Sequence, residues 1–212
     1  QDDGFGRVGL AGVTAALESR GMTLVAEGTY TRNTTAVKKA LLTIKKAKPD
    51  AVVMVGAYKP VAEFIKLSRK LKFNPTFVNI SFVGSDALAK ELGDAGEDVI
   101  ISQVVPFPWD TSVPAVAQYQ QALKAADPAA EPGFVSLEGY LTGRLALAAL
   151  DAAGTDLTRS SFLAALAGLR TVDFGGVTMT FGPEDNQGMD SVFLTRITKD
   201  GGFQPVVSGG GS

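Results

Sequence analysis

The sequence of 212 residues contains no cysteine and no histidine. This absence excludes cysteine nucleophiles, histidine general bases and the zinc sites that are built from these two residues. A bound metal would depend on carboxylate ligands alone, and we expect neither a metal nor a cofactor. The lack of cysteine suits oxidising and reducing compartments equally, so it does not place the protein in the cell.

A strong excess of charge of one sign is also missing. The 20 Lys and Arg residues are balanced by 22 Asp and Glu residues, which gives a formal net charge of -2. Nucleic-acid binding needs clustered positive charge to neutralise phosphates, so we expect no nucleic-acid partner. The sequence has no apolar run long enough to cross a bilayer. Since 45% of the residues are hydrophobic, the chain can still bury a sizeable core.

A strand followed by a helix organises the first half of the chain. Residues 51–55 form an unbroken apolar run, which is typical of a central parallel strand buried on both faces. Pro60 suits the first turn of a helix, because it lacks the N–H that is unpaired there. Tyr58 therefore lies at the edge where open α/β sheets bind ligands. On spacing alone, Tyr58 could equally contact a ligand or pack on the rim of the sheet.

Helical and strand-like periodicities alternate along the rest of the chain. We predict a helix over 8–20, a strand over 22–30, a helix capped by Thr34 or Thr35, and a helix from Pro60 to Leu71. A strand at 76–80, a helix at 86–92 and a strand at 99–105 follow. The second half predicts helices over 113–126, over 134–153 and after Thr158, then β-like segments at 174–181 and 191–198. This order predicts an α/β fold with a parallel sheet and helices on both faces.

A glycine motif offers an alternative function. Gly4, Gly6 and Gly9 form a G-x-G-x-x-G pattern, and Glu27 lies where a ribose-binding acid would stand in a dinucleotide fold. This reading makes the chain a piece of a Rossmann-type NAD-binding oxidoreductase. Two aspartates beside the motif would repel a pyrophosphate, and no strand precedes the glycines. The competing interpretation is a tight strand-to-helix turn that exposes Phe5.

The order of these pieces resembles the type I periplasmic solute-binding proteins of ABC importers, of the Leu/Ile/Val-binding kind. DDGFG at 2–6 resembles that family's turn with an aromatic residue, and VGAYKP at 55–60 resembles its strand end with a ligand-facing Tyr. ISFV at 80–83 resembles the segment in which amino-acid binders place an acid, and VVPFP at 104–108 resembles a hinge crossing. The resemblance implies a non-enzymatic periplasmic protein with two Rossmann-like lobes and the ligand-binding residues Phe5, Tyr58, Ser81 and Phe82.

The resemblance also implies a domain layout. Residues 1–109 would form lobe two without its first strand, 110–188 the C-terminal part of lobe one, and 189–207 the strands that return to lobe two. The first segment of lobe one would be missing, so a missing N-terminal segment or a partner chain would complete the site. An open sheet edge would otherwise favour a dimer. Residues 208–212 have the composition of an engineered Gly/Ser linker, which suggests a split or permuted protein.

Ser81 departs from the pattern of the amino-acid binders, which have a carboxylate at this position. A buried ammonium without a paired charge is costly, so the expected ligand is an aromatic or other carboxylic acid rather than an α-amino acid. Hinge closure around this ligand, with an ABC transporter permease as partner, is the function that the resemblance implies. A ligand-sensing receptor domain of the same fold remains an alternative.

Overall fold

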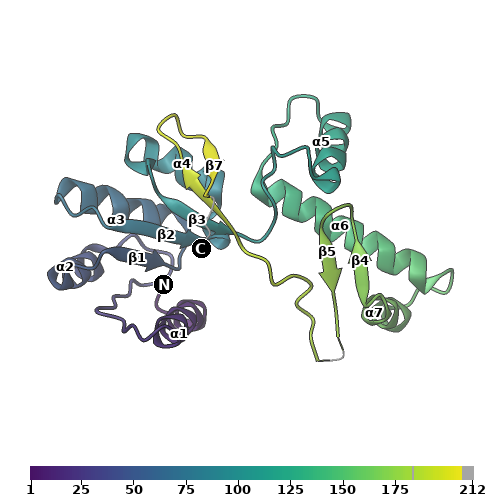
Figure 1. Ribbon diagram of the computed structural model, residues 1–212, viewed down its shortest axis with the longest axis horizontal. Helices are drawn as coiled ribbons and strands as arrows, with labels where there is room; N and C mark the ends of the chain where they lie inside the picture. The colour runs from purple at the N-terminus through teal and green to yellow at the C-terminus, as the bar shows by residue number, and fades with distance from the viewer. Residues whose placement is uncertain (183, 207–212) are drawn as a thin grey trace. The chain divides into compact units, whose positions relative to one another are not determined.

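The computed structural model describes residues 1–182 and 184–206, which form two compact units (Figure 1). Unit 1 contains Gln1–Ser102 and the described residues from Leu194 onward, and unit 2 contains Gln103–Phe193. The chain therefore leaves unit 1 once and returns to it once. The predicted Gly/Ser linker at 208–212 lies outside the described residues.

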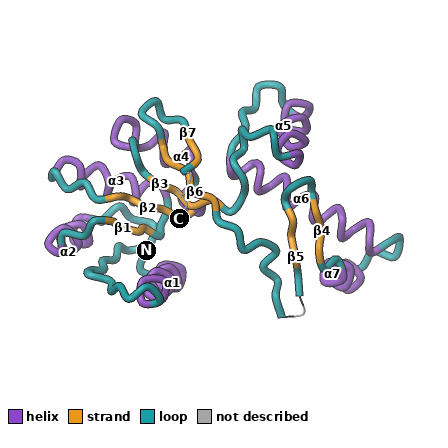
Figure 2. The backbone as a smooth tube through the Cα atoms, viewed as in Figure 1, coloured by secondary structure: helices purple, strands orange, loops and turns teal. Residues whose placement is uncertain are grey.

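Unit 1 is built on a five-stranded sheet with the order β1-β2-β3-β6-β7 (Figure 2). β1 pairs with β2 in parallel, β2 pairs with β3 in parallel, and β6 pairs with β7 in antiparallel fashion. The predicted parallel sheet is therefore confirmed. The strands are β1 Ala51–Met54, β2 Thr76–Ile80, β3 Ile100–Gln103, β6 Phe193–Ile197 and β7 Phe203–Pro205.

Three helices of unit 1 build its core against one face of this sheet. Leu41, Ile65 and Leu88 come from the three helices, and each is fully buried together with Phe77 of β2. The apolar residues of each of these helices recur at helical spacing, so one face of each helix is apolar and packs against the strands. The helices are α2 Lys38–Ala47, α3 Tyr58–Lys70 and α4 Ser85–Leu92, and short 3-10 turns lie at Ser81–Val83 and Gly93–Gly96.

The opposite face of the sheet is covered much less. Helix α1, Gly4–Glu18, lies beside it and has no buried residue. Val53 of β1 points to this side and is 41% exposed. The prediction that β1 is a central strand buried on both faces is wrong, because β1 is the edge strand of the observed sheet.

The segment before β1 also differs from the prediction. Residues 22–30 form no strand, since they pair with no other strand among the described residues. Helix α2 starts at Lys38 without a side-chain cap, so neither Thr34 nor Thr35 caps it. Thr34 instead closes a local turn, in which its hydroxyl bonds the Thr31 carbonyl at 2.7 Å.

The glycine motif lies within α1 rather than in a turn before it. Helix α1 begins at Gly4, four residues earlier than predicted, so Gly4, Gly6 and Gly9 are all helical. A Cβ atom at Gly6 would collide with the Gln1 carbonyl, and one at Gly9 would lie 2.5 Å from a methyl group of Val55. Close packing therefore explains two of these glycines without a bound phosphate.

Unit 2 is mainly helical. Tyr119 is 2% exposed, and its hydroxyl accepts the Gly133 N–H at 2.9 Å, which ties α5 to the start of α6. Thr158 caps α7 through a capping box with Ser161. The helices are α5 Pro114–Ala126, α6 Phe134–Ala153 and α7 Arg159–Gly168. None of the helices in the described ranges has the length and apolar character that a membrane span requires.

The predicted β-like segment at 174–181 is in fact part of a hairpin. β4, Thr171–Asp173, pairs with β5, Thr178–Thr180, in antiparallel fashion. Asp173 accepts the N–H groups of Gly175 and Gly176 at 2.9 Å, and both glycines have positive φ values. The turn between the strands therefore depends on residues that lie inside the predicted strand.

The core of unit 1 yields a stability prediction. We expect Ile65→Ala to lower the free energy of unfolding by about 2–5 kcal/mol, because Ile65 is fully buried and the change leaves a cavity. Leu42→Ala is the matched control on α2, where Leu42 is 49% exposed. Urea denaturation followed by circular dichroism measures both. Equal losses for the two variants would contradict this placement of the core.

Candidate functional site

The four predicted site residues all lie at one edge of unit 1. Tyr58 opens α3 just after β1, and Ser81 and Phe82 follow directly after β2. Because β1 and β2 are parallel, their carboxyl ends meet at the same edge of the sheet. Phe5 lies in the first turn of α1 and reaches this edge by contacting Phe82. This is the edge at which open α/β sheets bind ligands.

Phe5 and Phe82 form a partly exposed aromatic pair. Their ring centroids are 4.5 Å apart, and the ring planes are tilted by 55°. Phe82 is 59% exposed and Phe5 is 37% exposed, although large apolar side chains normally gain by being buried. The pair therefore offers an apolar surface beside the polar strand ends.

Tyr58 has a different environment. It is half-buried and packs against the hydrophobic core of unit 1. Gly56, two residues earlier, is buried against the Tyr30 hydroxyl, which a Cβ atom would approach to 2.4 Å. Burial raises the pKa of the Tyr30 phenol above its ordinary value. A side chain at position 56 would therefore have to displace the Tyr30 ring.

Ser81 lies in a segment without charge. It is half-buried and begins the 3-10 turn, where its carbonyl accepts the Gly84 N–H at 3.0 Å. Residues 81–85 contain no charged side chain, and the next carboxylate along the chain is Asp86, in the first turn of α4. Partial desolvation raises the pKa of the Asp86 carboxyl group, even though the residue keeps contact with solvent.

Asp3 is a residue that the sequence reasoning did not assign. Its carboxylate caps α1 by accepting the Gly6 N–H at 3.1 Å. This hydrogen bond lowers the pKa of Asp3 below its ordinary value. The Arg32 guanidinium lies 3.9 Å from the Asp3 carboxylate, and its positive charge lowers the pKa further. An acidic residue directly before a helix is a recognised capping signal, so the sequence contained the information. Because Phe5 is two residues further on, the cap also positions the aromatic pair.

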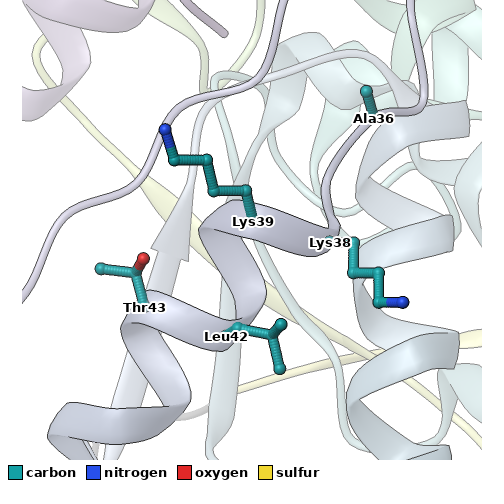
Figure 3. Close-up of a pocket in the computed structure, with 5 residues that line it drawn as sticks. All are labelled: Ala36, Lys38, Lys39, Leu42 and Thr43. Carbon is teal, nitrogen blue, oxygen red and sulfur yellow. The ribbon is translucent and has the colours of Figure 1, made fainter.

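A shallow depression lies elsewhere on unit 1, along α2 (Figure 3). It is lined by Ala36, Lys38, Lys39, Leu42 and Thr43, none of which is a predicted site residue. Figure 3 shows that the ammonium groups of Lys38 and Lys39 point in different directions, so they do not converge on one anion. We therefore place no site there. The described parts of the chain also bring together no group of three or more acidic side chains that could hold a metal ion.

Comparison with protein families identifies the chain. The family model for periplasmic binding proteins matches residues 1–202. This chain belongs to that family. Its members, and the solved structures that this chain resembles, are binding proteins rather than enzymes. A search of curated proteins gives no match.

Solved structures agree with this assignment. A possible leucine/isoleucine/valine-binding protein from Rhodopirellula baltica is 37% identical, with a TM-score of 0.91 over 98% of this chain. A leucine-binding protein from Thermotoga maritima has 18% identity and a TM-score of 0.81 over 94% of this chain. A fatty-acid ABC transporter substrate-binding protein from Thermomonospora curvata has 21% identity and a TM-score of 0.82 over 97%. The last two show a shared fold.

The chain spans little more than half the length of these relatives. It covers 57% of the Rhodopirellula protein, 56% of the Thermotoga protein and 54% of the Thermomonospora protein. The predicted family and the predicted periplasmic-binding-protein fold are confirmed. The assignment of Phe5, Tyr58, Ser81 and Phe82 to the ligand site stays a prediction.

The aromatic pair can be tested by a double-mutant cycle. Phe5→Ala and Phe82→Ala should show a coupling energy of about 0.5–1.5 kcal/mol in the free energy of unfolding, because each ring loses its partner in either single variant. Phe5→Ala combined with Leu71→Ala is the control, since Leu71 lies at the far end of α3. Additive effects for the Phe5 and Phe82 pair would contradict the contact.

The Asp3 cap predicts a pH dependence. Since the folded-state pKa of Asp3 is lowered, its stabilisation is complete above the unfolded pKa and is lost as the pH falls through the folded value. Helicity of α1 should therefore decline in acid. Asp3→Asn keeps a side-chain acceptor and should remove this part of the pH dependence, whereas Asp3→Ala should lose the cap at every pH. Amide exchange of Arg7 and Gly6 measured by NMR reports both effects. Identical exchange profiles for Asp3→Asn and Asp3→Ala would contradict the capping role.

Proposed function

We propose that this chain is part of a periplasmic solute-binding protein that captures a small organic acid for an ABC importer. The family match carries the solute-binding role, and the edge formed by Phe5, Tyr58, Ser81 and Phe82 is the proposed half-site. Because the relatives are longer than this chain, a further segment, in the same protein or in a partner chain, would supply the other half of the ligand site. The parent protein would work in the periplasm and deliver its ligand to a transporter permease.

Binding would proceed by closure of two lobes around the ligand. A ligand that contacts both lobes favours the closed state by its differential affinity for that state. Unit 1 corresponds to one lobe in this proposal, and unit 2 to part of the other. The two chain crossings, after Ser102 and after Phe193, would serve as hinge strands. The predicted lobe boundaries at 109 and 188 belong to the same proposal.

The chemistry of the edge favours an acid with an apolar body. The exposed rings of Phe5 and Phe82 would cover the apolar part of the ligand. The first turn of α3 has no side-chain cap, so its N–H groups and the Tyr58 hydroxyl are suited to a carboxylate. Residues 81–85 carry no charge, so an ammonium group beside Ser81 would find no counter-ion within this segment. An α-amino acid is the alternative ligand.

A calorimetric comparison tests the ligand class. The full-length protein should bind phenylacetate or benzoate more tightly than phenylalanine or leucine, because only the amino acids bring the ammonium group. Phe82→Ala should weaken binding by at least about tenfold, since it removes an aromatic contact. Leu71→Ala, on the opposite end of α3, should leave the affinity unchanged. Tight binding of the amino acids together with no binding of the acids would refute the proposed class.

Ser81 offers a sharper test of the same idea. Ser81→Glu should raise the affinity for α-amino acids and lower it for simple acids, because the new carboxylate pairs with an ammonium and repels another carboxylate. Ser81→Gln adds the same bulk without the charge and is the matched control. If both substitutions change the two ligand classes by the same factor, position 81 does not face the ligand's charged end.

A further inference from the structure

Residues 38–72, which include α2, β1 and α3, hold half of the positive charge of the chain. They contain ten of the 20 Lys and Arg residues but only two of the 22 Asp and Glu residues. The segment therefore has an excess of eight positive charges, and the rest of the chain has an excess of ten negative charges. Such a separation of charge suits the positive segment to an anionic partner.

The two helices of this segment end beside each other (Figure 1). Helix α2 leads into β1 and α3 leads into β2, and these two strands are parallel. Both helices therefore end at the amino edge of the strands, opposite to the proposed ligand edge. The Lys45 ammonium group joins the two helix ends by donating to the Leu71 carbonyl at 2.8 Å. We call the four exposed lysines at these ends the basic edge: Lys46, Lys48, Lys70 and Lys72.

The charges of the basic edge are not neutralised by its surroundings. None of its four side chains forms an ion pair with another residue in the described ranges, where the ion pair of α3 joins Lys66 to Glu91 at 3.4 Å. Asp50 follows at the start of β1 and is exposed. Asp98, before the next strand of the sheet, pairs with Arg196 at 3.2 Å. The four ammonium groups are thus available to an external anion.

Lys48 and Lys72 occupy backbone positions that favour glycine. Lys48 ends α2 with a φ of 52°, and Lys72 lies two residues after α3 with a φ of 54°. Both values belong to the left-handed region, where a side chain costs free energy and glycine does not. Glycine would end both helices better, so the lysine at each of these two corresponding places indicates a use for its charge.

Helix stability also leaves part of the charge on α2 unexplained. The helix dipole favours Lys46 and Lys70, which lie in the last turns of their helices. It disfavours Lys38 and Lys39, which lie in the first turn of α2, where no acidic residue accompanies them. Figure 3 shows their ammonium groups pointing in different directions. They therefore do not surround one anion, but they extend a surface that can meet many.

We propose that the basic edge binds the phosphate groups of an anionic phospholipid membrane. Clusters of about four to eight lysine or arginine residues bind such surfaces, and each residue contributes roughly fivefold in affinity. The exposed basic residues of the segment are all lysine, a point charge that needs no fixed geometry. None of its aromatic side chains is exposed, so it lacks the stacking surface that single-stranded nucleic acids use. The inference rests on the proposed function in one respect, that the parent protein works beside a membrane.

Co-sedimentation of the full-length protein with vesicles tests this proposal. The protein should bind vesicles of phosphatidylcholine and phosphatidylglycerol in equal parts, and it should not bind phosphatidylcholine alone. Raising the salt from about 0.1 M to about 1 M should release it, because the Debye length falls from about 10 Å to about 3 Å. Glutamine at all four positions of the basic edge should weaken binding at least about tenfold, whereas arginine at the same four positions should preserve it.

A matched control removes the same charge elsewhere. It combines four exposed positions outside the segment: Arg20→Gln, Lys90→Gln, Arg159→Gln and Lys199→Gln. This variant should bind the mixed vesicles nearly as well as the unchanged protein. Equal weakening by both sets would overturn the proposal, because net charge alone would then explain binding. Absence of binding to the mixed vesicles, or tighter binding to duplex DNA than to these vesicles, would overturn it as well.

Glycine substitutions separate the charge from the fold. Lys48→Gly together with Lys72→Gly should keep or raise the Tm, since both positions have positive φ values. The same variant should weaken vesicle binding at least about threefold. A stable variant with unchanged vesicle binding would overturn the proposal. Ligand affinity by calorimetry should not change in any of these variants, since no changed residue lies at the ligand edge. Vesicle binding without ligand binding in the unchanged protein would refute the proposed function alone.

Discussion

The parallel pairing of β1 with β2 fixes which side chains meet at one edge of unit 1. Because Ala51 lies opposite Thr76 and Met54 opposite Asn79, the two strands end at the same level. The helix that follows β1 and the 3-10 turn that follows β2 then start side by side. Tyr58, Ser81 and Phe82 share one edge for this reason, and the capped start of α1 adds Phe5 to it. The hydrophobic core that α2, α3 and α4 form with the strands stabilises this pairing.

Much of this arrangement could be predicted from the sequence. The apolar run at 51–55 predicts a strand, and the sequence also predicts the observed limits of β2 and α6 and the Thr158 cap. These are local patterns, because the residues that produce each of them lie close together in the sequence. The family could be predicted as well, because the order of strand ends and aromatic residues resembles that of the family over most of the chain. Asp3 shows that even a missed residue had a signal, since an acid before a helix start predicts a cap.

The errors arose where the structure depends on partners distant in sequence. Residues 22–30 alternate like a strand, but a strand exists only when its backbone groups are paired. The position of β1 at the edge could not be deduced from its sequence. A continuous apolar run indicates that a strand can be buried, but it does not indicate which segments pair with it or pack on it. The turn of the β4–β5 hairpin contains Gly175 and Gly176, which have positive φ values. The strand-like periodicity of residues 174–181 gave no indication of this turn. The assignment of Phe5, Tyr58, Ser81 and Phe82 to a ligand site stays a prediction, because it rests on the resemblance to the family and not on a local pattern.

The return of the chain to unit 1 also constrains when the sheet can be completed. The backbone N–H of Asp98 donates to the Ile197 carbonyl at 3.0 Å. The Thr195 hydroxyl donates to the Ile101 carbonyl at 3.3 Å, across a separation of 94 residues. All of unit 2 is synthesised between these partners. On the ribosome, β3 must therefore wait with one side unpaired while α5, α6 and α7 emerge. Contacts that join such distant residues cost more chain entropy to close than local ones, so we expect the pairing of β3 with β6 to form late in folding.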